Sequence, residues 1–189
     1  MKSNLCSDHR SIQYKNQLPL DNSQALYIRN QSNALFYKIR MNGRIRRFIS
    51  CLMRKSCELL SLSSLTQLDG TVNSSEIGLR SVPLSMIIGS ENRSKDFDNN
   101  FVPLSERNHQ RWMRISDMFL KDQTIPVIDL IQIGKFYFVR DGHHRISVAK
   151  ALGKKYLDAH VTVMHLQGES LSKMEIKTAK VGLELALSL

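Results

Sequence analysis

Residues 141–145 read Asp-Gly-His-His-Arg and bring a carboxylate, a glycine and three potentially cationic side chains into one short stretch. An apolar, aromatic segment precedes this stretch and an amphipathic pattern follows it, so the chain is predicted to turn here from a strand into a helix. The free N–H groups of a first helical turn and the helix dipole favour an anion, and arginine adds a forked donor. The sequence therefore predicts a phosphate-binding turn.

Two other interpretations of the same stretch stay open. In the first, His143 and His144 cap the helix and form hydrogen bonds within the domain. In the second, Asp141, His143 and His144 ligate a metal ion. Adjacent histidines point to different faces, however, and no His-x-x-x-His or Glu-x-x-His spacing supplies a further ligand. We therefore predict no metal ligands.

The elements that position this turn follow from the spacing of the apolar residues. They are strands over 79–88, 127–133, 136–140 and 155–164, and helices over 105–121 and 145–152. Gly134-Lys135 is typical of a hairpin turn, and Gly153 is typical of the left-handed residue that ends a helix. The order strand, helix, hairpin, helix, strand predicts a small α+β domain with a mixed sheet over 76–168.

Two segments of this domain resemble the ParB/sulfiredoxin-like domain family. Residues 82–88, Val-Pro-Leu-Ser-Met-Ile-Ile, resemble the first box of the family, in which Ile-Pro-Leu and an apolar pair precede a loop with an arginine. Residues 136–149 resemble the second box, with Gly-His-His-Arg at 142–145 where ParB proteins carry Gly-Glu-Arg-Arg and sulfiredoxins carry Gly-Cys-His-Arg. The resemblance covers about residues 79–165.

The resemblance implies a nucleotide ligand, because this turn binds ATP in sulfiredoxins and CTP in ParB proteins. It implies that the glycine lets the backbone approach a phosphate, which the neighbouring side chains and an arginine of the loop after the first strand contact. The implied phosphate-binding residues are Gly142, His143, His144, Arg145 and Arg93. Asp141 departs from both groups, but a similar string occurs in kinase-like relatives of the fold, where the acid supports metal or substrate. That likeness makes Asp141 the candidate catalytic residue, which would help to place Mg²⁺ beside the nucleotide.

Two departures from the family limit its activities here. His143 stands where sulfiredoxins carry their nucleophilic cysteine, and the predicted domain contains no cysteine, so sulfinic-acid reduction is not expected. ParB partition proteins carry helix-turn-helix and dimerisation domains after this fold, whereas about 24 residues follow His165. A complete partition protein is therefore not expected either.

The charge of the chain suggests a second binding region. Of the net charge of +10, residues 1–60 carry +8, from eleven Lys and Arg against three acidic residues. Residues 1–32 are polar without a sustained period and are predicted to be disordered. Residues 33–75 are predicted to form a basic amphipathic helix, broken or bent at Gly43, and a Ser/Thr-rich linker from 61. Residues 169–189 are predicted to form a helical tail.

Four arginines, Arg40, Arg44, Arg47 and Arg54, recur on one face of this basic helix. We expect them to contact the phosphate backbone of DNA or RNA. Two alternatives stay open: a solvated face on a helix that packs its apolar stripe against the domain, and binding to a membrane surface.

Three hypotheses for the function follow. The first is a nucleotide-binding regulatory module, with or without slow NTP hydrolysis. The second is a DNA- or RNA-binding accessory protein. The third, by analogy with serine kinases of related fold, is a small-molecule kinase with Asp141, Glu106 or Asp96 as the general base. The chain has no run of about 18 apolar residues, no signal-like apolar core near its start and no Cys-x-x-Cys pair, so we expect a cytoplasmic protein without a transmembrane segment.

Overall fold

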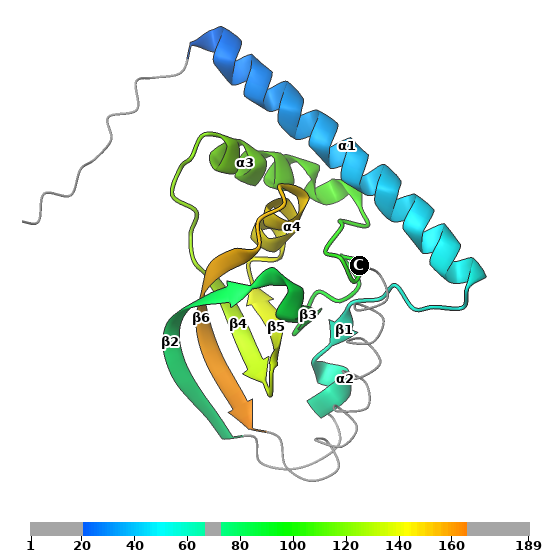
Figure 1. Cartoon of the computed structure of the whole chain (residues 1–189), viewed down its shortest axis with the longest axis vertical. Coiled ribbons are helices and arrows are strands. Elements are labelled where there is room, and N and C mark those ends of the chain that lie inside the picture. The colour runs from blue at the N-terminus through cyan, green and yellow to red at the C-terminus, as the bar shows by residue number, and fades with distance from the viewer. Residues whose placement is uncertain (1–20, 67–72, 166–189) are drawn as a thin grey trace, which may run out of the picture.

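The structure, a computed structural model, describes residues 21–66 and 73–165 (Figure 1). The described residues form a six-stranded mixed sheet in the order β1-β3-β5-β4-β6-β2. The strands are β1 Leu60–Ser61, β2 Asn73–Pro83, β3 Ile87–Ser90, β4 Ile128–Ile133, β5 Phe136–Asp141 and β6 Tyr156–His165. The predicted α+β class with a mixed sheet is therefore confirmed.

Three of the helices pack in succession outward from one face of this sheet. The helices are α1 Asn22–Leu52, α2 Ser63–Thr66, α3 His109–Leu120 and α4 His143–Ala151, with short 3-10 helices η1 Leu84–Met86 and η2 Glu106–Asn108. Helix α3 packs against α4 on one side and α1 on the other, and Figure 1 shows α1 crossing the outside of the molecule. The predicted helix over 105–121 is confirmed as η2 followed by α3, with the Ser105 hydroxyl accepting the Arg107 N–H.

The centre of the sheet is the predicted hairpin. Strands β4 and β5 pair antiparallel, with Ile133 opposite Phe136 across the Gly134-Lys135 turn. Strand β6 then lies parallel to β4 and antiparallel to β2, and β3 lies parallel to β5. This pairing places the carboxyl ends of β3 and β5 side by side, which brings the segments after both strands to one edge of the sheet.

The prediction of one strand over 79–88 is wrong. Strand β2 ends at Pro83, whose ring removes the N–H that would continue the ladder, and η1 turns the chain with Leu84 buried. The chain then crosses to the other side of the sheet, where β3 begins at Ile87. The predicted linker over 61–75 is also partly wrong, because it contains parts of β1 and β2 and all of α2; residues 67–72 lie outside the described residues.

Apolar side chains fill both faces of the sheet and the space between the helices. The cluster between the sheet and α4 includes Ile128, Leu130, Val139 and Ile146, and the opposite face carries Ile131, Ile133 and Phe138. A third cluster joins the helices and consists of Phe36, Trp112, Met113 and Val148. Trp112 is fully buried and donates its indole N–H to Ser147 Oγ at 2.9 Å, which fixes α3 on α4.

Helix α1 starts earlier in the sequence than predicted and continues without a break to Leu52. It begins at Asn22, so the prediction of disorder is wrong for residues 22–32, while residues 1–20 and the predicted tail lie outside the described residues. Contacts with α3 hold this first part, because Ser32 donates to Asp117 Oδ1 at 2.6 Å and Arg29 pairs with the same carboxylate. Because these partners are distant in sequence, no local pattern predicts this first part of the helix.

The prediction that Gly43 breaks the helix is wrong, because α1 continues through this residue. It is buried within α1, and a Cβ atom there would lie 3.0 Å from Val102 Cγ1. The glycine therefore permits a close approach of α1 to the loop between β3 and α3, and packing compensates its low helix propensity.

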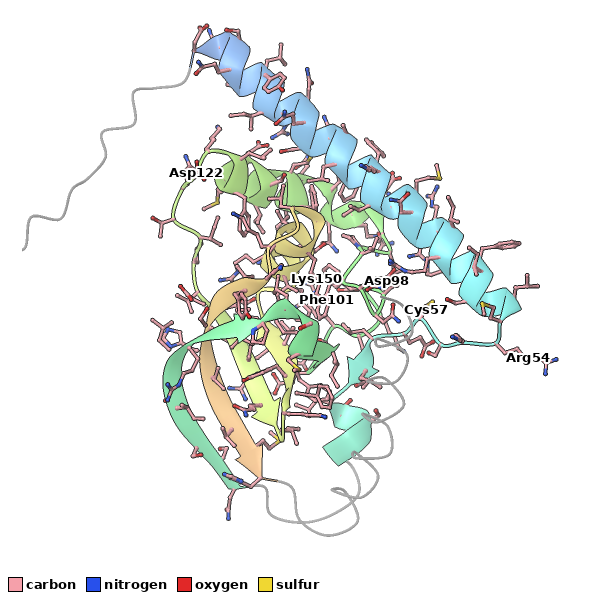
Figure 2. The ribbon with its side chains drawn as sticks, in the orientation of Figure 1. Arg54, Cys57, Asp98, Phe101, Asp122 and Lys150 are labelled. Atoms are coloured by element: carbon pink, nitrogen blue, oxygen red, sulfur yellow. The ribbon has the colours of Figure 1, made fainter. Side chains whose placement is uncertain are left out.

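A buried carboxylate fastens α1 to the same loop (Figure 2). Asp98 is 1% exposed, and its Oδ1 accepts the N–H groups of Asn100 and Val102 at 3.0 and 2.9 Å. Its Oδ2 accepts from Arg46 and Arg47 of α1, both at 3.1 Å. One side chain thus shapes the 97–102 loop and also pairs with two cations of the helix.

We predict that Asp98→Asn lowers the free energy of unfolding by about 3 kcal/mol, because the amide offers one oxygen instead of two and leaves both arginines without a counter-charge. Urea denaturation followed through Trp112 fluorescence measures this change. Asp158→Asn, at an exposed carboxylate of β6, is the control and should change stability by less than about 0.5 kcal/mol. Equal effects of the two substitutions would contradict this role of Asp98.

Candidate anion-binding site

The turn between β5 and α4 depends on one glycine. Gly142 is the N-cap residue of α4 with φ 104° and ψ 15°, a left-handed conformation that glycine adopts without strain. A Cβ atom here would lie 2.4 Å from Ile128 Cγ2 on the neighbouring strand. Strand β5 therefore passes into α4 within one residue, and the predicted strand–turn–helix is confirmed. The helix begins at His143, so both histidines belong to its first turn.

His143 is held by the loop that follows β3. It is buried, its Nε2 lies 2.7 Å from Ser90 Oγ, and its ring stacks on Phe97 at 5.6 Å between centroids. Ser90 Oγ also accepts the Arg93 N–H at 2.9 Å. Sequence reasoning missed Ser90 because its proximity to the turn follows from the parallel pairing of β3 with β5, which local patterns do not indicate.

His144 has a different environment. It is 3% exposed and lies edge-on to Phe97 at 5.1 Å, yet within the described part of the chain neither of its ring nitrogens has a hydrogen-bond partner. An unsatisfied buried polar group costs about 1–3 kcal/mol. The first turn of α4 therefore contains a buried imidazole whose hydrogen-bonding capacity is unused among the described residues.

Both histidines are neutral at pH 7. Burial, reinforced by the cation of Arg93, lowers the pKa of His143 to about 4. Burial and the cation of Arg111 lower the pKa of His144 to about 4 as well. Each neutral ring carries one N–H donor, and the surrounding arginines give this region a positive potential that a bound anion would relieve.

Arg145 is anchored within the protein. Its Nη1 donates to the carbonyl oxygens of Pro126 and Val127 at 3.0 and 2.6 Å, and its Nη2 pairs with Asp141. The side chain of Asp141 is 56% exposed. Arg145 and Asp141 therefore form an ion pair within the turn, beside the residues that precede β4.

Arg93 is the remaining residue of the predicted set. Its Nε pairs with Asp96 at 2.8 Å, and its charge is felt by both histidines. Asp96 and Glu106, the other acids considered for a general base, are each paired with an arginine, Glu106 with Arg40.

A cationic cleft of about 310 Å³ adjoins Arg145. Its described lining combines three arginines with four apolar side chains and includes no carboxylate: Arg111, Arg114, Ile115, Met118, Ile125, Pro126 and Arg145. Arg111 and Arg114 lie three residues apart on α3 and therefore project from one face of that helix. Sequence reasoning missed both, although this spacing beside the buried Trp112 was a usable signal.

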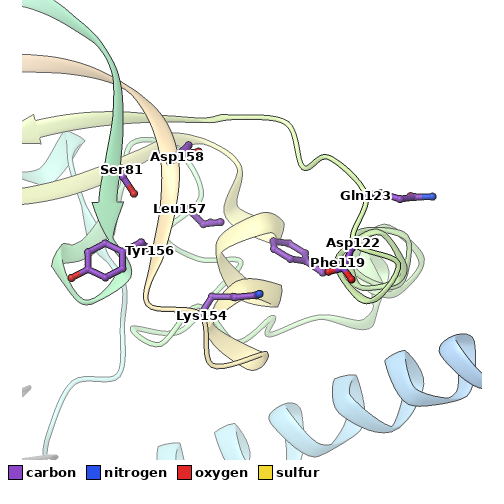
Figure 3. A pocket seen from close by; sticks show the side chains of 8 residues that line it. All are labelled: Ser81, Phe119, Asp122, Gln123, Lys154, Tyr156, Leu157 and Asp158. Atoms are coloured by element: carbon purple, nitrogen blue, oxygen red, sulfur yellow. The ribbon is translucent and has the colours of Figure 1, made fainter. Parts of the chain in front are cut away.

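Two other clefts have mixed character. One of about 320 Å³ lies between the ends of α3 and α4 and the start of β6, where Lys154 faces a lining with Asp122 and Asp158 (Figure 3). Another of about 250 Å³ contains Lys150, whose pKa burial lowers to about 8 and whose Nζ lies 4.7 Å from the Phe101 ring centroid (Figure 2). The described lining of these two clefts, like that of the cleft beside Arg145, does not include His144.

The structure does not keep the four arginines of the predicted nucleic-acid face together. Arg40 is only 8% exposed and pairs with Glu106 at 2.6 Å, and Arg47 pairs with Asp98. Arg44 and Arg54 are exposed to solvent. Two of the four therefore fasten α1 to the domain, which agrees with the alternative of a helix packed on it.

In the described ranges 21–66 and 73–165, no three His, Cys, Asp or Glu side chains gather as metal ligands. The sequence matches no known protein family in a comparison with family models, and no curated protein matches it. The resemblance to the ParB/sulfiredoxin-like domain therefore stays a prediction from the residues at 82–88 and 136–149.

We predict that Gly142→Ala destabilises the fold by about 3 kcal/mol, because the added methyl group meets Ile128 and the backbone is left-handed. Gly153→Ala is the matched control, since Gly153 has φ +71° and open space around it, and it should cost about 1 kcal/mol. Thermal unfolding by circular dichroism measures both. A Gly142 variant as stable as the Gly153 variant would show that the contact with Ile128 does not constrain the turn.

Proposed function

We propose that this protein binds the phosphate groups of a nucleotide at the N-terminus of α4. The observation that carries the proposal is His144, a neutral, buried imidazole with neither ring nitrogen satisfied among the described residues. It stands in the first helical turn, where N–H groups have no partner within the helix and the helix dipole favours negative charge. An anion bound here would accept from the helix N–H groups and from the one N–H of the neutral ring.

The neighbouring cleft supports a nucleotide in preference to inorganic phosphate alone. Arg111, Arg114 and Arg145 would neutralise further phosphate groups, and the apolar part of the lining offers a surface for a base or ribose. Pockets that hold small organic ligands commonly combine a mostly apolar wall with a few placed polar groups. ATP and CTP are the candidates that the sequence resemblance implies.

Mg²⁺ would arrive with the nucleotide. This ion is commonly held by phosphate oxygens, waters and one or two carboxylates, so it needs no preformed cluster of ligands. Asp141 is the exposed carboxylate of the turn and is suited to that role, provided that the phosphates compete with it for Arg145.

A regulatory binding module suits the site better than a nucleophilic enzyme. The one Ser–His pair of the turn region, Ser90 with His143, is fully enclosed on the serine side, which leaves no approach to a substrate. Hydrolysis or phosphoryl transfer would have to use Asp141, whose carboxylate is partly exposed. Nucleic-acid binding and kinase activity remain hypotheses from the sequence.

We predict that isothermal titration with ATP or CTP and Mg²⁺ gives a dissociation constant below about 1 mM, and that Arg111→Ala weakens binding about tenfold or more. Arg107→Ala is the control, because it removes the same charge from an exposed arginine of η2 outside the cleft. His144→Phe should also weaken binding while it leaves the free protein as stable or more stable, since it removes unsatisfied nitrogens.

Three results would contradict the proposal. The first is the absence of binding at millimolar nucleotide, and the second is an equal loss in the Arg107 and Arg111 variants, which would show a general charge effect. The third is unchanged binding by His144→Phe, which would separate the ligand from the turn.

A further inference from the structure

The side of α1 that faces away from the domain carries a continuous row of apolar side chains. Residues three or four positions apart lie on one face of an α-helix, and this row follows that spacing. We call it the outer stripe, and it consists of Tyr37, Met41, Ile45, Phe48 and Leu52. All five are exposed, Phe48 to 73% and Leu52 to 79%; Tyr37 lies at the margin of the stripe, where its ring centroid is 5.8 Å from that of His109 on α3.

The opposite side of α1 is the one that packs on the domain. Ser32, Phe36, Arg40 and Gly43 are its buried residues, and they face α3 and the loop before it. The helix therefore has two apolar faces, one of which the domain covers. Scattered exposed apolar residues are normal on a protein surface, but an aligned row on one helix is typical of a docking surface.

The cations of α1 also fall into two groups, one paired with acids of the domain and one exposed to solvent. No acidic residue occurs from Asn22 to Cys57. Four arginines form ion pairs with acids of the domain: Arg29 with Asp117, Arg40 with Glu106, and Arg46 and Arg47 with the single carboxylate of Asp98. Four exposed cations enter no ion pair with the described residues: Lys38, Arg44, Arg54 and Lys55. Lys38 and Arg44 flank the outer stripe on its two sides, and the other two follow the end of the helix.

We propose that the outer stripe docks on the surface of an anionic lipid bilayer, with α1 lying parallel to the membrane. Its apolar side chains would enter the boundary between headgroups and acyl chains, and the unpaired cations would meet anionic headgroups. No helix among the described residues is long and apolar enough to span a bilayer.

The charge pattern argues against the other occupants. A second copy of the chain would bring the cations of two stripes together without an acidic residue between them. A nucleic acid would satisfy the cations but leave Phe48 and Leu52 in water. A bilayer with acidic lipids satisfies both the apolar row and its charged margins. This inference is independent of the nucleotide site.

The test is co-sedimentation of the full chain with vesicles of phosphatidylcholine containing about a quarter of phosphatidylglycerol. We expect the parent protein to bind these vesicles and to bind pure phosphatidylcholine at least about tenfold more weakly. The double variant Phe48→Ser, Leu52→Ser should lower the partition coefficient at least about tenfold. Lys38→Gln, Arg44→Gln should lower it about tenfold as well, and less so at high salt.

The matched control is Leu79→Ser, Tyr156→Ser, which removes two large apolar side chains that are each 59% exposed on β2 and β6. It should leave binding within about twofold of the parent. All substituted positions are exposed, and unchanged thermal unfolding verifies that each variant is folded.

Four outcomes of the experiments without nucleic acid would overturn the inference. They are no binding of the parent to anionic vesicles, equal binding to neutral vesicles, an equal loss in the control, and a parent dimer without vesicle binding that Phe48→Ser, Leu52→Ser dissociates. A duplex DNA added to the vesicles decides the remaining alternative. If it displaces the protein and still binds the Phe48, Leu52 variant with parental affinity, the cations serve a nucleic acid and the inference fails.

Discussion

The left-handed backbone of Gly142, pressed against Ile128, is the constraint on which the candidate site depends. Because glycine has no side chain, the backbone can turn this close to Ile128, and β5 passes into α4 without a loop. The first helical turn therefore starts where the strand ends. The next two residues then point into the protein, where Phe97 contacts both rings. A glycine required by packing thus places two neutral imidazoles at a helix N-terminus.

The two histidines differ in a way that their sequence does not reveal. His143 obtains a partner from Ser90, which the parallel pairing of β3 with β5 brings alongside. His144, one residue later, points to a different side and obtains none among the described residues. His143 therefore holds the turn in place, whereas His144 keeps two unpaired ring nitrogens among the described residues, which is the observation behind the proposed site.

Local patterns predicted the parts of the fold that local forces determine. The β4–β5 hairpin, α3, α4 and the turn itself have short-range signals in the Gly134-Lys135 dipeptide, the Ser105 cap and the spacing of apolar residues. The break at Pro83 and the crossing from β2 to β3 depend on which edge of the sheet is free, and the first turns of α1 depend on contacts with Asp117. Arg145 was predicted as a phosphate ligand from its type and position, but two backbone carbonyls and Asp141 hold it in the structure.

Helix α1 shows how one basic segment serves two purposes. Its inward arginines are matched by Asp117, Glu106 and Asp98 and belong to the stability of the fold. Its outward cations have no such partners in the described residues and flank an apolar row. The net charge alone therefore overestimates how many cations are available to a polyanion. The ion pairs within the protein determine which cations remain for binding.

If an anion binds at the proposed phosphate site, the pKa of His144 should change on binding. Burial holds the pKa of His144 at about 4 in the free protein, and an anion bound at the helix N-terminus favours the protonated ring. NMR of ¹⁵N-labelled imidazoles, followed through a pH titration with and without saturating pyrophosphate, reads this pKa directly. We expect pyrophosphate to raise the titration midpoint of His144 by at least about one pH unit. A His144 midpoint that does not move would show that no anion binds beside this ring.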